Sequence, residues 1–154
     1  MRNVGRAALL FSSMMNFTDD LVRCQITIET DTLTPAQISE RVGTEFDVAH
    51  RVGEPRGRTG KTWETNVWQL RETRSGTEDS GAHDLLPLCL DGLLKRALAI
   101  SAGLTQVVAD FGGEFAIHTT SASIPGISLS DEQVRQIADL GLSMDIDIVL
   151  IADE

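Results

Sequence analysis

The same helix-start signature occurs twice in this chain. Thr34 stands three residues before Gln37, and Ser130 stands three residues before Gln133. This spacing is typical of a capping box, in which the hydroxyl group accepts one backbone N–H and the glutamine side chain accepts another. A leucine precedes each hydroxyl residue, so an apolar contact can also form across each helix start. Two short helices with well-defined beginnings are therefore predicted.

Glycines mark where these two helices end. Gly43 and Gly141 are placed so that a residue in the left-handed conformation stops each helix. The helices are expected at about 35–42 and within 129–141. The repeat is interpreted as two uses of the same capping chemistry, and a duplication is the alternative.

Alternation of apolar and polar residues predicts strands around these helices. The strands are expected at 23–30, 49–53, 61–71, 114–121 and about 142–151. The glycine-rich residues between the second and third of them must form a loop or a hairpin tip.

A leucine-rich stretch at 84–111 has helical spacing. Gly103 is predicted to divide it into two helices, and Pro87 is tolerated only near a first turn. The element order is then β-α-β-β-α-β-α-β. It begins with the βαββαβ order of ferredoxin-like folds, and an αβ unit is added at the C-terminus. We expect an α+β protein in which helices cover one face of a mainly antiparallel sheet.

A chain of 154 residues is expected to form one domain. Residues 1–19 are predicted to be a mobile leader, and residues 20–154 a single α+β domain. No apolar run approaches the roughly 20 residues that a membrane-spanning helix needs. The apolar part of the leader is too short for a signal peptide. No membrane association is expected.

The two cysteines, Cys24 and Cys89, lie far apart in the sequence and outside any C-x-x-C motif. Cys24 alternates with isoleucines on a predicted strand, and Cys89 lies in the leucine-rich helix. Both are predicted to be buried thiols, with a disulfide as the alternative. Unpaired thiols suit a reducing cytoplasm, so we predict a cytoplasmic location.

Charge is distributed unevenly along a chain whose net charge is −10. Residues 1–75 hold ten basic and ten acidic residues, whereas residues 76–154 hold three basic and thirteen acidic ones. An acidic surface repels phosphate backbones, so no nucleic-acid binding is expected. The acidic half suits a basic protein partner that is attracted by electrostatic steering.

One loop departs from this acidic background. It carries four cations and the single carboxylate of Glu54 between residues 51 and 61, and two tryptophans follow closely. Guanidinium groups beside a glycine-rich backbone can hold a carboxylate or a phosphate, and a tryptophan can anchor a protein partner. The candidate binding residues are Arg51, Arg56, Arg58, Lys61, Trp63 and Trp68. The alternative is a solvated hairpin tip whose arginines pair with the protein's own carboxylates.

The triplet Gly60-Lys61-Thr62 does not indicate a P-loop. That motif needs a glycine where this chain has Pro55. It must also open a helix, whereas a strand pattern follows here. Nucleotide hydrolysis is therefore not expected.

Asp145 and Asp147 alternate on the last predicted strand, so their carboxylates lie on one face about 7 Å apart. They are weak metal candidates, because no histidine or third acid lies beside them. Their expected role is to deter unwanted pairing of an edge strand. The rest of this strand is apolar, so a homodimer through the same edge is also considered.

The isolated histidines, which are expected on the surface, are His50, His83 and His118.

The order of these segments resembles the domain-of-unknown-function 4279 family of small, mostly bacterial proteins. The matching stretches are RCQITIET, LTPAQISERVG, the RVGEP loop, VWQLRE, the leucine-rich helix and LSDEQVRQIADLGLSMDIDIVL, within residues 20–151. The resemblance implies an α+β fold, a cytoplasmic location and no established activity. It assigns no catalytic residues.

No nucleophile–base motif or metal-ligand spacing is visible in the sequence. We therefore expect a non-enzymatic binding or interaction module that needs no cofactor. Its partner would be a protein or a small anionic ligand, and one version is an immunity-type inhibitor of a basic partner. The alternative is a small-anion-binding protein or an enzyme that uses the loop at 51–63.

Overall fold

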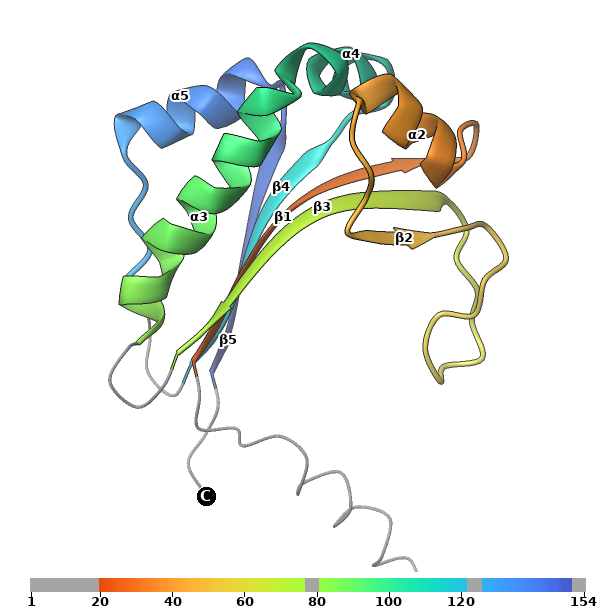
Figure 1. Ribbon diagram of the computed structural model, residues 1–154. Helices are drawn as coiled ribbons and strands as arrows, with labels where there is room; N and C mark the ends of the chain where they lie inside the picture. Colours follow the sequence, from red (N-terminus) through yellow and green to blue (C-terminus); the bar gives the residue numbers. More distant parts are fainter. Residues whose placement is uncertain (1–19, 77–80, 122–125, 151–154) are drawn as a thin grey trace, which may run out of the picture.

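The computed structural model describes residues 20–76, 81–121 and 126–150, which form a five-stranded sheet and four helices (Figure 1). The strands are β1 (Leu21–Thr30), β2 (Val48–His50), β3 (Asn66–Ser75), β4 (Glu114–Ser121) and β5 (Ser143–Leu150). The helices are α2 (Pro35–Val42), α3 (Ala82–Ala99), α4 (Ser101–Phe111) and α5 (Asp131–Asp139). The predicted α+β class is confirmed. The predicted leader lies outside the described residues.

The strands lie in the order β2-β3-β1-β4-β5. All neighbours are antiparallel except β4 and β5, which are parallel and are connected through α5. The sheet is therefore mainly antiparallel, as predicted, and β2 and β5 are its edges. The helices lie on one side of the curved sheet, whereas no described helix covers the other side (Figure 1).

The core lies between the sheet and the helices, because alternate strand residues point toward the helices. Cys24 and Ile26 of β1 and Phe115 of β4 are fully buried there. Leu90 of α3 and Leu104 of α4 pack against them from the helical layer. With few aromatic residues in the chain, aliphatic side chains form most of this core.

Both predicted capping boxes are present. The Thr34 hydroxyl accepts the backbone N–H of Gln37 at 3.3 Å, and the Gln37 side chain accepts the backbone N–H of Thr34 at 2.9 Å. The corresponding distances for Ser130 and Gln133 are 3.2 and 2.8 Å. The glycines that follow the two helices have φ angles of +89° and +74°. Local chemistry therefore fixes the ends of α2 and α5 as predicted.

The leucine-rich stretch is divided at Ile100, so the prediction of a break at Gly103 was wrong. Gly103 lies inside α4, where that helix packs on α2. A Cβ atom at Gly103 would come within 2.5 Å of the Arg41 carbonyl oxygen and 2.6 Å of the Val42 carbonyl oxygen. The glycine is therefore needed for close helix packing rather than for a helix end.

Pro87 lies inside α3 on an exposed face, beyond the first turn where it was expected.

The third strand also differs from the prediction. β3 begins at Asn66, so Lys61–Thr65 belongs to the preceding loop, and β2 ends at His50 rather than near residue 53. The reason is that residues 51–65 pair among themselves instead of extending the sheet. Residues that favour strands, Thr62, Trp63 and Thr65, precede Asn66, which made the end of this segment resemble part of the strand.

Candidate functional site

Residues 51–65 connect β2 to β3 and project from one end of the sheet (Figure 1). We call this segment the hairpin loop. Its arms are joined by backbone hydrogen bonds: the Gly53 N–H donates to the Trp63 carbonyl and the Trp63 N–H donates to the Glu54 carbonyl, both at 2.9 Å. Glycines with positive φ angles allow the turns at its tip. The loop is therefore a structured element that holds its side chains in place.

Trp63 is contacted by two side chains. The His50 ring stacks on it with 4.2 Å between centroids and an interplanar angle of 10°. The Arg56 guanidinium carbon lies 4.7 Å from the centre of the Trp63 ring, in cation–π contact. These contacts fix Trp63 and Arg56 relative to the sheet.

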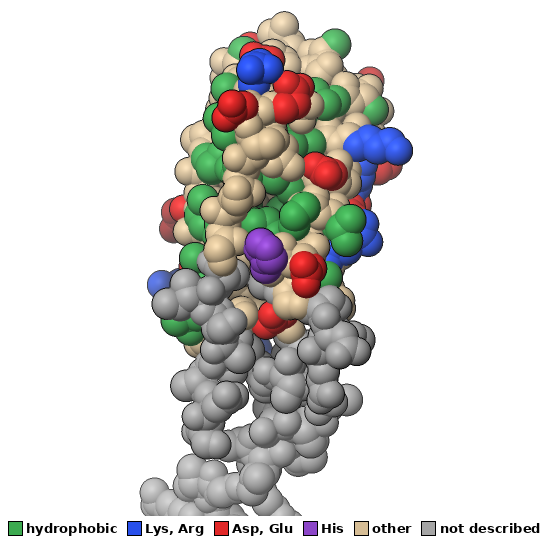
Figure 2. All heavy atoms as spheres, turned by 90° about the vertical axis from the view of Figure 1, so that its left-hand side faces the viewer, with side chains coloured by type: hydrophobic (Ala, Val, Ile, Leu, Met, Phe, Trp, Pro, Cys, Tyr) green, Lys and Arg blue, Asp and Glu red, His purple; other side chains and the backbone are tan. Residues whose placement is uncertain are grey.

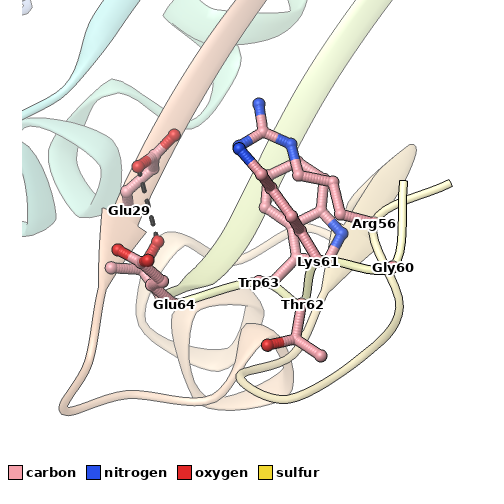
Figure 3. A pocket seen from close by; sticks show the side chains of 8 residues that line it. Glu29, Arg56, Gly60, Lys61, Thr62, Trp63 and Glu64 are labelled. Atoms are coloured by element: carbon pink, nitrogen blue, oxygen red, sulfur yellow. Dashed lines mark hydrogen bonds between the residues drawn. The ribbon is translucent and has the colours of Figure 1, made fainter.

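An open cavity of about 630 Å³ lies at the base of the hairpin loop. Carboxylates and cations line different parts of it. Figure 3 shows Glu29 and Glu64 together on one side, and Arg56 with Trp63 on the other. Lys61 also lines the cavity. The Glu29 carboxylate accepts a hydrogen bond from the hydroxyl of Thr65 at 3.4 Å, which ties β1 to the loop.

The structure brings together only part of the predicted binding set. Arg56, Lys61 and Trp63 line the same cavity. Arg51 lines a separate hollow of about 390 Å³, and Arg58 is exposed at the tip of the loop. The carboxylates of the cavity were not predicted, because Glu29 comes from β1, far from the loop in sequence.

Trp68 lies away from this site. Its side chain is fully buried on the helix-facing side of β3, and its indole Nε1 donates to the Ser39 hydroxyl at 3.0 Å. It is a core residue, so it is not available at the surface to anchor a partner. The sequence grouped it with Trp63 because the two residues are close along the chain.

Asp145 and Asp147 are exposed on β5, which is an edge strand as predicted. The Asp147 carboxylate lies 3.5 Å from Nδ1 of His118 on the neighbouring strand. Within residues 20–76, 81–121 and 126–150, no group of three or more His, Cys, Asp or Glu residues could hold a metal ion. His83 is exposed as expected, whereas His50 and His118 are half-buried because each packs against a neighbour.

Both cysteines are buried and unpaired, which confirms the predicted thiols. The Cys89 thiol donates to the backbone carbonyl of Glu72 at 3.2 Å. A hydrogen bond with Cys89, together with burial, raises the pKa of the Cys24 thiol above its ordinary value. The same hydrogen bond lowers the pKa of the Cys89 thiol. Both thiols are nevertheless enclosed in the core, which limits their access to reagents.

Sequence reasoning missed a cluster of polar side chains on the uncovered face of the sheet. Arg23 and Gln25 of β1, Arg71 of β3 and His118 of β4 lie there as cross-strand neighbours. Alternation along each strand indicates a polar face, but it does not indicate which strands will be adjacent. No sequence motif links these residues.

None of the described helices is both long and apolar enough to cross a membrane. A comparison with protein-family models matches residues 20–150 to a domain of unknown function, DUF4279. Comparisons with curated proteins and with solved structures found no match. The matched region spans all five strands and all four helices described above. The chain therefore belongs to the DUF4279 family.

Proposed function

We propose that this protein is a binding module without catalytic activity, and that the cavity of the hairpin loop receives a ligand carrying both a positive and a negative charge. One observation carries the proposal: Glu29 and Glu64 line one side of the cavity, while Arg56 and Lys61 also line it (Figure 3). A small zwitterion or a short peptide segment would match this arrangement. The proposal keeps the negative charge of the predicted small anionic ligand and adds a positive one.

The size and rigidity of the site support this proposal. A volume of about 630 Å³ lies within the range of small-ligand pockets. The stack of His50, Trp63 and Arg56 holds one wall in position before a ligand arrives, which lowers the entropy cost of binding. The Trp63 ring also offers an apolar surface to the ligand.

The proposal can be tested with a panel of free amino acids and dipeptides. Binding is followed through Trp63 fluorescence in a Trp68→Phe background, and ligands are recovered afterwards to test for chemical change. Lys61→Gln and Glu64→Gln should each weaken binding by roughly tenfold, since each removes a charged partner. Arg58→Gln, on the same loop but outside the cavity, is the matched control. If no panel member binds, or if a bound one is converted, the proposal is wrong.

A second candidate is an immunity-type inhibitor that docks a basic partner on the acidic edge of the sheet. It is supported by the exposed carboxylates of Glu114, Asp145 and Asp147, which gather at β4 and β5. Such a partner should elute from the immobilised protein as salt rises. The Asp145→Asn/Asp147→Asn double variant should no longer bind this partner, whereas Asp131→Asn on α5 should still bind it. Retention by the double variant would contradict this candidate.

The same edge strand supports a proposal of homodimer formation. Among the described strands, β5 has no neighbour on its outer side, and five of its apolar side chains are at least 40% exposed. Apolar side chains also reach the surface beside α3 and α5 (Figure 2), where Leu88 is 61% exposed. Sedimentation analysis tests the proposal: an Ile146→Lys variant should be monomeric at concentrations where the natural protein is dimeric. A monomeric natural protein would rule it out.

We further propose that β1 to β4 with α2 and α3 form a ferredoxin-like core to which α5 and β5 are added. The order β2-β3-β1-β4 and the antiparallel pairing of each neighbour support this assignment.

A cytoplasmic location is supported by two buried thiols that form no disulfide.

A further inference from the structure

The face of the sheet that no described helix covers has a cluster of polar side chains at its centre. Gln25 of β1 is the cross-strand partner of Arg71 on β3, and Arg23 of β1 is the partner of His118 on β4. These four residues therefore lie on three adjacent strands. We call them the open-face cluster. It is separate from the hairpin cavity, since Gln25 lies about 13 Å along β1 from Glu29.

Each member of the open-face cluster has a side-chain atom that is shielded from solvent and lacks a hydrogen-bond partner in the described part of the chain. The four atoms are Arg23 Nε, Gln25 Oε1, Arg71 Nε and His118 Nε2. Only one further atom of this kind, in Thr119, occurs among the described residues. Native proteins rarely leave such atoms unpaired. Their concentration at one place indicates a surface that is completed by something else.

Two members of the cluster, Gln25 and Arg71, are joined through a chain of hydrogen bonds. The Arg71 guanidinium donates to the Gln69 side chain at 2.7 Å, and Gln69 donates to the Thr27 hydroxyl at 3.2 Å. The Gln25 amide donates to the same hydroxyl at 3.3 Å, and Gln25 is only 9% exposed. Arg71 and Gln25 are therefore already ordered before binding.

The charge of the cluster is not balanced. Burial lowers the pKa of Arg71, and the nearby positive charge of Arg23 lowers it further, whereas Asp47 acts in the opposite direction. Asp47 is also engaged by the Arg96 guanidinium at 2.8 Å. The Nε atom of Arg23 has no hydrogen-bond partner among the described residues.

Three carboxylates, those of Glu114, Asp145 and Asp147, lie on the β4 and β5 side of the cluster, and within the described residues none of them forms an ion pair with Arg23 or Arg71. The Asp147 carboxylate lies 3.5 Å from Nδ1 of His118. Two half-buried guanidinium groups thus lie close together without a carboxylate between them. A bound anion would relieve their mutual repulsion.

We propose that Arg23 and Arg71 bind an oxyanion, the phosphate or carboxylate group of a small ligand, on the open face of the sheet. Either group presents several oxygens that accept hydrogen bonds from guanidinium groups, and charge-assisted bonds of this kind are the stronger ones. Gln25 lies beside the bound group and provides an acceptor for a hydroxyl or N–H of the ligand. This site does not depend on the ligand proposed for the hairpin cavity.

The test is an NMR titration of the full chain with inorganic phosphate and, separately, with malonate, at constant ionic strength set by chloride. Binding should shift the backbone amide signals of residues 23–25 and 69–71. Arg23→Met and Arg71→Met should each weaken the affinity roughly 10- to 100-fold, the loss expected when a hydrogen bond to a charged group is removed. The matched control is Arg74→Met on the helix-facing side of β3, which should bind as the natural protein does. A response to either probe supports the site and identifies the chemistry of its ligand.

Thermal melting separates a binding role from a structural one. Without ligand, Arg23→Met should melt at or above the temperature of the natural protein, because a like-charge contact is removed. A structural arginine would instead lower the melting temperature and leave the affinity unchanged. Arg23→Lys keeps the charge without the guanidinium fork and should bind with intermediate affinity, which provides a test if the methionine variant does not fold. The proposal is overturned if neither probe shifts these signals beyond the chloride control, or if affinity is unchanged in both methionine variants.

Discussion

Trp68 Nε1 donates a hydrogen bond to Ser39 Oγ over 3.0 Å, and this buried contact joins β3 to α2. Ser39→Ala would leave the indole N–H without its acceptor in the core. We expect the free energy of unfolding to fall by about 1–3 kcal/mol, the cost of an unsatisfied buried donor. Urea unfolding followed by circular dichroism measures the change. Ser128→Ala at an exposed site is the control, and an equal effect of both substitutions would contradict the role given to Ser39.

Gly103→Ala should lower stability although alanine favours helices. The added Cβ would lie 2.5 Å from the Arg41 carbonyl oxygen, so α2 and α4 must move apart. We expect a loss of about 1–3 kcal/mol, as for other overpacked sites. Thermal unfolding of the two proteins gives the difference.

Gly92→Ala in α3 is the matched control for this substitution. Its Cβ would approach only the Glu72 side chain, at 3.3 Å, and no backbone atom of a neighbouring element. Replacing glycine inside a helix should therefore leave stability unchanged or raise it by up to about 1 kcal/mol. A Gly103→Ala protein as stable as the Gly92→Ala protein would show that the helices do not need this close approach.

The parts of the fold that depend on local chemistry could be predicted from the sequence. The ends of α2 and α5 follow from hydroxyl, glutamine and glycine side chains within a few residues of one another. The break at Ile100 could not be found in this way, because Gly103 is explained by the carbonyl groups of α2, which are distant in sequence. The start of β3 was missed because strand-favouring residues such as Thr62 and Trp63 belong to a loop that pairs with itself.

The same distinction applies to the candidate sites. The cations of the hairpin loop are adjacent in sequence, so their grouping was predicted, but Glu29 opposite them was not. Trp68 was wrongly grouped with Trp63, because the change from loop to strand between them alters which way a side chain points. Arg23 and Arg71 become neighbours only through the register of β1 and β3. That register depends on the packing of the whole sheet.

The two cysteines should react slowly with a thiol reagent in the folded protein. Both are buried, and the raised pKa of Cys24 lowers its thiolate fraction at mildly alkaline pH. Labelling with Ellman's reagent at pH 8 should accelerate strongly when denaturant is added. A Ser128→Cys variant supplies an exposed thiol for comparison. Rapid labelling of both natural cysteines without denaturant would be inconsistent with the buried pair.

The two capping boxes offer an internally matched pair of substitutions. Thr34→Ala and Ser130→Ala each remove the hydroxyl that accepts the backbone N–H of the glutamine three residues later. Each should cost about 0.5–2 kcal/mol of helix stability. The consequences should differ, because α2 contributes four buried residues to the protein and α5 contributes Ile137 as its single buried residue.

Thr34→Ala should therefore lower the stability of the whole domain, whereas Ser130→Ala should mainly increase local opening of α5. Hydrogen exchange measures both effects: the first variant should speed exchange in the central strands, and the second should speed it within residues 131–139 only. Thr34→Ser and Ser130→Thr keep the hydroxyl groups and should restore slow exchange. Faster exchange of the central strands in Ser130→Ala would show that α5 unfolds together with the core.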